Sequence, residues 1–255
     1  MNLIVANVPE GFLAQALWIL ETNWPLFWYG IKITLMLAFL GTIFGLVIGL
    51  VLGGLRAITI DEQDKAIVKL FKKFLHAIVN IYVWFFRGTP MMVQAMFLYY
   101  AFRSILGWSV NVAGIVIISV NTGAYMAEII RSGIQSVDKG QMEAARSLGM
   151  SSAQTMIHII LPQAIRNSFP SIGNEFIVNI KDSSMLNVIG VIELYFQTTS
   201  VAGSMYLSTP TYFIACCFYL ILTSIATIIL SYTEKRLNQQ KSCLPDECCM
   251  VKGEA

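Results

Sequence analysis

The sequence predicts an all-α integral membrane protein with about five membrane-spanning helices. Of its 255 residues, 56% are hydrophobic and 13% are charged, whereas about a quarter of a soluble domain is charged. Mean hydropathy is +0.66, and three long stretches lack Asp, Glu, Lys and Arg: 33–55, 104–127 and 194–233. About 20 apolar residues cross a bilayer core, where the backbone must pair internally and therefore forms helices. A soluble helical domain is excluded because its helices would need charged faces.

The first predicted span covers residues 27–55 and follows an outer N-terminal segment, 1–26. This segment has no basic start and carries Glu10, so it does not have the pattern of a signal peptide. Aromatic residues near the start of the span predict an interfacial belt: Trp18, Trp24, Trp28 and Tyr29. Glycines in the span have spacings that would let another helix approach closely: Gly41, Gly45, Gly49, Gly53 and Gly54. The general abundance of glycine in membrane helices explains them equally well.

A cytoplasmic amphipathic helix is predicted over 62–86. Apolar residues recur every three or four positions from Ile67 to Ile78, and lysines lie between them: Lys65, Lys69, Lys72 and Lys73. This pattern is typical of a helix in the membrane interface whose lysines face anionic lipid headgroups. Thr89-Pro90 ends the pattern, because the residue before a proline disfavours the helical conformation.

Four further spans complete a predicted transmembrane domain, 27–235. They cover about 90–105, 110–130, 162–192 and 210–232. Gly107-Trp108 is expected to form an outer turn, and Ser208 or Thr209 is expected to cap the last span, with Pro210 in its first turn.

Lysine and arginine concentrate on one side of this layout. Fourteen of the 17 lie in 56–87, in 131–166 or after Tyr232. With five spans, these segments follow the first, third and fifth spans and therefore lie on the same side of the membrane, whereas an even number of spans would distribute them over both sides. The positive-inside rule makes that side the cytoplasm. We therefore predict a multi-pass protein of the cell membrane with its N-terminus outside and a cytoplasmic tail, 236–255. The tail thiols suit a reducing compartment better than a disulfide: Cys243, Cys248 and Cys249.

The polar stretch 138–162 predicts two short helices joined by a tight turn. Gly149 suits the left-handed conformation that ends a helix, and Ser151 with Gln154 makes a capping box for the next one. Pro162 is expected to close that second helix. A helix–turn–helix of this kind reads DNA or docks into another protein. DNA binding requires a basic face, and 143–161 holds one Arg and no Lys, so no nucleic-acid partner is expected.

This stretch resembles the EAA loop of ABC importer permeases. The resemblance rests on Glu143-Ala144-Ala145, on Gly149 after three further residues, and on Ile159-x-Leu161-Pro162. It implies the type I ABC importer permease fold, in which this loop forms coupling helices that sit in a cleft of a cytoplasmic ABC ATPase subunit. The ATPase-coupling residues that it implies are Glu143, Ala144, Ala145, Gly149, Leu161 and Pro162.

Flanking segments resemble permeases for polar amino acids, and the likeness covers about residues 28–235. These segments are 86–90 with Gln94, 123–131, 139–141, and 173–176 with 181–184. The resemblance implies uptake of an amino acid of the glutamine, glutamate, arginine, histidine and cystine class, without choosing among them. It implies four kinds of partner: an ATPase subunit dimer, a second permease copy or a homologous permease, an extracytoplasmic amino-acid-binding protein, and membrane lipid. ATP and Mg are expected on the ATPase, so this chain is expected to be no enzyme and to bind no cofactor or metal.

Polar and charged groups inside the predicted spans are the candidates for a substrate pathway, because such groups are costly in a membrane. A zwitterionic amino acid needs oxygens for its ammonium and donors for its carboxylate. The candidates are Thr89, Gln94, Asn121, Glu128, Asn179, Lys181, Asp182, Ser183 and Ser184. Lys181 and Asp182 would equally well neutralise each other or a neighbouring helix without touching substrate. Glu175 is expected to have a structural or gating role.

Three classes of function compete. A permease needs no nucleotide site of its own, and the sequence has no P-loop. An ion-coupled carrier acting without an ATPase would favour an internal repeat, and none is evident. A membrane-embedded enzyme would need a nucleophile or a metal constellation, and neither Gly-x-Ser-x-Gly nor His-Glu-x-x-His occurs. The sequence therefore favours the permease.

Overall fold

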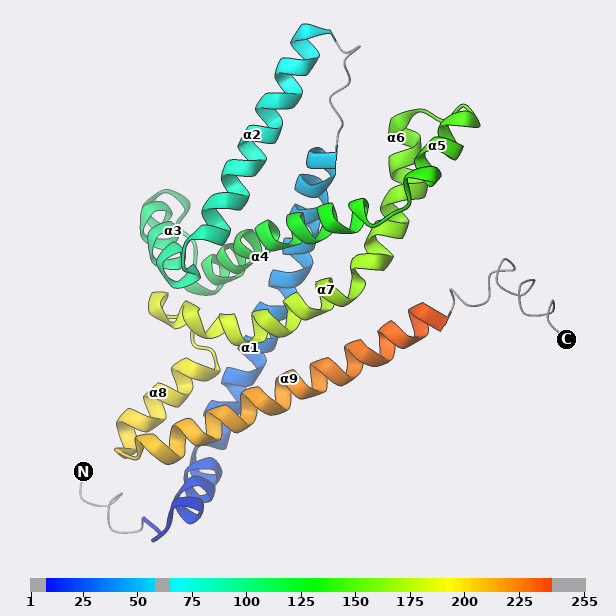
Figure 1. Ribbon diagram of the computed structural model, residues 1–255. Coiled ribbons are helices and arrows are strands. Elements are labelled where there is room, and N and C mark those ends of the chain that lie inside the picture. Colours follow the sequence, from blue (N-terminus) through cyan, green and yellow to red (C-terminus); the bar gives the residue numbers. More distant parts are fainter. Residues whose placement is uncertain (1–7, 58–64, 240–255) are drawn as a thin grey trace, which may run out of the picture.

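The computed structural model describes residues 8–57 and 65–239, and in these residues it contains helices and no strands (Figure 1). The predicted all-α class is confirmed. The α-helices are α1 (Phe12–Ala57), α2 (Ala66–Gly88), α3 (Met91–Leu106), α4 (Val110–Gln135), α5 (Lys139–Ser147), α6 (Ser152–Thr155), α7 (Leu161–Asp182), α8 (Leu194–Met205) and α9 (Ser208–Gln239). A π-helix, Met156–Ile160, joins α6 to α7, and a 3-10 helix, Ser183–Ile189, follows α7. The first residues of the predicted outer segment and the tail cysteines lie outside the described residues.

Three of the described helices, α1, α4 and α9, are long and apolar enough to cross a membrane. They coincide with the first, third and fifth predicted spans. Helix α3 is apolar but has only 16 residues, and α7 has 22 residues with many polar side chains. The total of five spans therefore stays a prediction.

Helix α1 extends further outward than the first predicted span. It begins at Phe12, inside the predicted outer segment, and it is kinked at Asn23 (φ −115°, ψ 15°). Pro25 lies two residues further on and removes a backbone donor, which is a usual cause of such kinks. Trp24 and Trp28 are exposed, as an aromatic belt requires, whereas Trp18 packs against the core of α1, α8 and α9.

The helices α1 and α4 approach so closely that their contact has room only for glycine. A Cβ on Gly41 would lie 2.7 Å from Ile118, and one on Gly45 would lie 2.8 Å from Thr122. Two further glycines in the same row, Gly49 and Gly53, meet Met126 and Ile130 in the same way. The close helix approach predicted from the glycine spacing is therefore found, and α4 is the partner. Gly54, in contrast, faces open space.

Helix α2 has an exposed first half and a packed second half. Its predicted apolar and basic residues between 65 and 78 are mostly exposed, whereas Val79 and Val83 are buried against Ala127 of α4. Tyr82 donates a hydrogen bond of 2.5 Å to the Val120 carbonyl oxygen of α4. The helix ends at Gly88, as Thr89-Pro90 predicted, and Gly107 adopts the left-handed conformation (φ 58°) in the predicted outer turn.

The expectation that Pro162 closes a helix is wrong. The backbone continues from α6 through the π-helix into α7, and Pro162 lies in the first turn of α7. Proline is tolerated in the first turn of a helix because a backbone N–H there would have no i−4 partner within that helix. The π-turn shifts the local pairing so that the Leu161 N–H reaches the Met156 carbonyl oxygen.

The fourth predicted span, 162–192, is also too long. Helix α7 ends at Asp182, Gly190 is left-handed (φ 90°), and a separate helix, α8, follows. The predicted start of the last span at about 210 lies close to the break between α8 and α9, but α8 itself was not predicted, because the stretch 194–233 has no charged residue to mark a separate helix. Ser208 and Thr209 belong to α9 itself rather than capping it, and Pro210 lies in its first turn as predicted.

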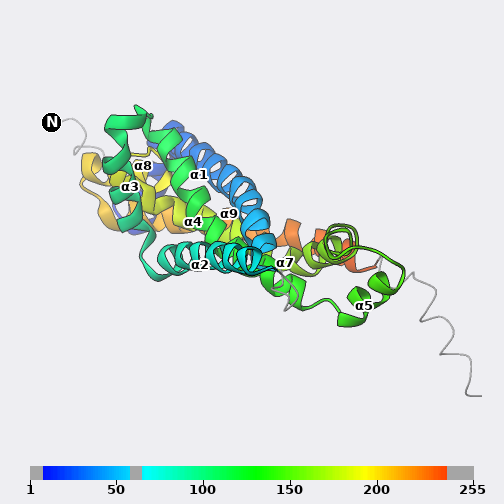
Figure 2. The same ribbon diagram turned by 90° about the horizontal axis from the view of Figure 1, so that it is seen from above.

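The molecule is elongated, and its two ends differ in character. Figure 2 shows α5 at one end, whereas α3, α8 and the beginning of α1 lie at the other. Helices α4 and α7 lead to the end that carries α5 and α6, and α9 also runs toward it (Figure 1).

The α1–α4 contact predicts the effect of a side chain at Gly49. Gly49→Leu should lower the free energy of unfolding by about 1–3 kcal/mol or more, since overpacking forces helices apart. Gly54→Leu, at the open position, is the matched control and should leave stability nearly unchanged. Thermal unfolding of the detergent-solubilised protein measures both, and equal stability of the two variants would contradict the close contact.

Candidate functional site

The hairpin made by α5 and α6 is built as the sequence predicts. Asp138 caps α5 by accepting a hydrogen bond of 2.6 Å from the Gly140 N–H, and Gly149 is left-handed (φ 84°). Ser151 and Gln154 form the reciprocal capping box, with hydrogen bonds of 3.2 and 2.9 Å. The predicted turn and second helix start are confirmed.

One edge of this hairpin is exposed and includes a large apolar side chain. Glu143, Ala144 and Gly149 are exposed, and Leu148 has 85% of its surface accessible. Of the other predicted coupling residues, Ala145 is buried inside the hairpin, Leu161 is half-buried and Pro162 is exposed.

The base of the hairpin is an apolar joint. Val137, which follows α4, packs with Ile160 and Ala164 at the start of α7, and partly buried side chains of α5 and the π-helix pack against them. This joint packs the base of the hairpin against the ends of α4 and α7.

Thr89, Gln94 and Asn121, three of the predicted pathway residues, form one buried network. The Gln94 amide nitrogen donates to the Thr89 hydroxyl at 2.7 Å, and the Asn121 amide donates to the Gln94 oxygen at 2.8 Å. Gln94 also donates to the backbone oxygens of Phe86 and Thr89. These side chains therefore hold the α2–α3 break against the middle of α4.

Asn179 lies in a second buried network, which joins three helices. Its amide donates to the Thr42 hydroxyl of α1 at 2.9 Å, and its oxygen accepts from the Thr122 hydroxyl of α4 at 2.9 Å. Thr42 and Thr122 were not singled out from the sequence, because a threonine in an apolar helix more often bonds its own backbone.

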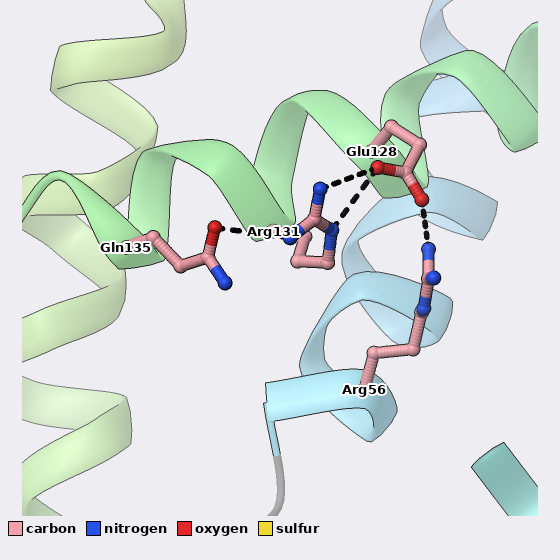
Figure 3. A network of polar contacts seen from close by, with 4 residues as sticks. All are labelled: Arg56, Glu128, Arg131 and Gln135. Carbon is pink, nitrogen blue, oxygen red and sulfur yellow. Dashed lines mark hydrogen bonds and ion pairs between the residues drawn. The ribbon is translucent and has the colours of Figure 1, made fainter.

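Glu128 lies about two turns before the hairpin end of α4, and Figure 3 shows it between Arg56 of α1 and Arg131 of its own helix. Arg56 of α1 donates to one carboxylate oxygen. Arg131 donates twice to the other oxygen, at 3.0 and 2.8 Å, and also to Gln135 at 2.9 Å. Beside them an open pocket of about 370 Å³ lies between α4 and α7, and its polar lining is Glu128, Arg131, Ser132, Ser136, Asn167, Ser168 and Ser171.

The last candidates cluster where α7 gives way to the 3-10 helix. Lys181 is exposed, Asp182 and Ser184 are half-buried, and the buried Ser183 donates to the Ile180 carbonyl oxygen. Asp182 is within electrostatic range of Lys181 and of Glu175.

Arg87, at the end of α2, is a member of this cluster that sequence reasoning did not select. It is within electrostatic range of Glu175, and its guanidinium lies 5.4 Å from the centre of the Tyr125 ring. A cation and two carboxylates from α2 and α7 thus share one region.

Glu193 is a second residue that the sequence did not indicate. Its side chain is completely buried and caps α8, accepting from the Tyr195 and Phe196 N–H groups at 2.8 and 2.7 Å and from the Tyr219 hydroxyl of α9 at 3.0 Å. Thr34 of α1 accepts from the Leu194 N–H. Glu193 therefore joins α8 and α9 at the end opposite the hairpin.

Long apolar helices that carry an exposed polar hairpin at one end are typical of a membrane transport component. The family profile described as "binding-protein-dependent transport system inner membrane component" matches residues 65–239. The chain belongs to this family.

Named relatives agree with this family assignment. The glutamine transport system permease protein GlnP of Escherichia coli K12 is 36% identical over 217 residues, which are 84% of this chain and 93% of the relative. A solved amino acid ABC transporter with histidines matches with a TM-score of 0.75 and 35% identity, over 89% of this chain and 99% of that one. An inward-facing MetNI methionine ABC transporter matches with a TM-score of 0.72 and 25% identity, over 85% and 98%.

The geometry of Glu193 predicts how α8 responds to its loss. Glu193→Ala leaves three buried donors without an acceptor and should cost about 1–3 kcal/mol of stability. Glu193→Gln keeps one acceptor oxygen and should cost less. Tyr219→Phe removes one donor only and is the matched control. Thermal unfolding ranks the three variants, and an Ala variant as stable as the Phe variant would contradict the assigned cap.

Proposed function

We propose that this chain is the membrane-spanning permease subunit of an ATP-driven, binding-protein-dependent importer of polar amino acids, with glutamine the first substrate to test. The observation that carries the proposal is the exposed α5–α6 hairpin on a bundle of membrane helices of this family. The names of the relatives support the substrate class. ATP and Mg are proposed to bind to a dimer of separate ATPase subunits, and an extracytoplasmic binding protein is proposed to deliver the amino acid.

The hairpin is proposed to be the ATPase contact. Leu148 is largely exposed at a turn, and a leucine in that position gains about 1.5–3 kcal/mol when a partner buries it. The apolar joint at Val137 and Ile160 would pass a displacement of the hairpin to α4 and α7. Helices that rock as rigid bodies are a known way to alternate access to a substrate site.

The region of Arg87, Glu175 and Asp182 is proposed as the substrate pathway. An amino acid carries one cationic and one anionic group. This region offers a guanidinium on α2 and two carboxylates on α7. Lys181 and Ser184 lie beside it. The buried networks of Gln94 and Asn179 support the helices that carry these groups, since their amides are already hydrogen-bonded within the bundle.

A second permease copy or a homologous permease is proposed to complete the pathway. One chain leaves many large apolar side chains exposed on α1 and α9, and a bundle this small does not enclose a channel. The concentration of basic residues on the side of the hairpin supports an N-terminus outside and a cytoplasmic C-terminus.

The proposed ATPase contact predicts that Leu148→Asp weakens binding of the ATPase about 10- to 100-fold, which corresponds to the lost burial of one leucine. Copurification of the permease with its ATPase subunit measures this. Leu148→Met should bind normally, and Gly149→Pro should fail because the left-handed turn cannot form. Undiminished copurification of the Asp variant would contradict the contact.

The proposed pathway predicts that Asp182→Asn lowers uptake at least tenfold while ATPase copurification is unchanged. Uptake of labelled glutamine, glutamate, arginine, histidine and cystine is measured in vesicles that hold the whole complex and its binding protein. Lys181→Gln separates the alternatives. If the two charges only neutralise each other, both variants should lose stability alike; if Asp182 contacts substrate, its variant alone should lose uptake.

A further inference from the structure

The Arg56–Glu128 contact joins the end of α1 to α4 close to the hairpin. Both side chains are only 19% exposed. Both oxygens of the Glu128 carboxylate are occupied, one by Arg56 and the other by Arg131 (Figure 3). An acidic group so fully engaged is poorly placed to receive the ammonium of a substrate.

Among the described residues, the rest of the α1–α4 interface shows no direct side-chain hydrogen bond between the two helices. The glycine row of α1 meets Ile118, Thr122 and Met126 through van der Waals contact, which holds membrane helices close. The second polar link between these helices, through Asn179, passes by way of α7. Among the hydrogen bonds of the described residues, Arg56–Glu128 is the direct side-chain link from α1 to α4.

Glu128 also lies where a displacement of the hairpin would first reach α4. Three residues separate the end of α4 at Gln135 from the start of α5 at Lys139, and Glu128 is about two turns before that end. Arg131 bonds to Glu128 and Gln135, which both belong to its own helix, so it adds no link between α4 and α1.

We propose that the Arg56–Glu128 ion pair is the positioning contact that makes α1 move together with α4 when the α5–α6 hairpin is displaced. Glu128 then acts through the helices and does not contact substrate. The inference rests on the proposed coupling of the hairpin to an ATPase. The glycine row holds the two helices together without the ion pair, so losing the pair affects coupling more than assembly.

The test compares Arg56→Gln, Arg56→Lys and Arg131→Gln in the complete reconstituted complex with ATPase and binding protein. The readout is the amount of amino acid transported for each ATP hydrolysed, with copurification and thermal unfolding measured alongside. Arg56→Gln should lower this ratio at least fivefold while assembly is retained, and Arg56→Lys should restore most of it. Arg131→Gln, which leaves the link between the helices in place, should stay near the wild-type ratio.

Three outcomes would overturn the inference. The first is a wild-type ratio for Arg56→Gln, and the second is an equal loss for Arg131→Gln. The third is failure of Arg56→Gln to assemble, which would assign the pair to folding alone. If instead the wild-type chain does not bind the ATPase, the proposed function itself fails, and that result is distinguishable because it appears before any substitution is made.

Discussion

The close approach of α1 and α4 is the constraint on which the rest of the bundle depends. Four glycines, spaced one turn apart, bring the α1 backbone against the side chains of α4. In a membrane the surrounding lipid is as apolar as the side chains, so such van der Waals contact, rather than the hydrophobic effect, holds helices together. This contact holds α4 in position, and α2 and α7 pack against α4. Three residues separate the end of α4 from the start of the α5–α6 hairpin.

Polar residues inside this bundle serve two purposes. Gln94, Asn121 and Asn179 bond to partners on other helices, and unsatisfied amides would be costly in that environment. Arg87 of α2 and Asp182 of α7 both lie within electrostatic range of Glu175. This division separates the amides that hold the helices together from the charged groups that are proposed to line the substrate pathway.

The two ends of the molecule use local chemistry for different tasks. At one end a left-handed glycine and a capping box shape a hairpin that presents Leu148 outward. At the other end the buried Glu193 joins α8 to α9. The Arg56–Glu128 pair lies between the hairpin and the scaffold, where it connects a helix that carries the hairpin to one that does not.

The sequence by itself determined the helical class, the apolar stretches of α1, α4 and α9, and the hairpin turn, because each depends on local composition or on residues a few positions apart. The turn at Gly149 with the capping box of Ser151 and Gln154 is an example, because the hydrogen bonds of the capping box join residues only three positions apart. The sequence did not reveal the end of α7, the existence of α8 or the continuation past Pro162. A stretch without charged residues gives little indication of where one helix ends and the next begins, and no sequence pattern marks a π-turn. Only the tertiary structure brought Arg56 to Glu128, Thr42 to Asn179, and Arg87 toward Glu175. These pairs lie far apart along the chain, and their contacts depend on how the helices cross.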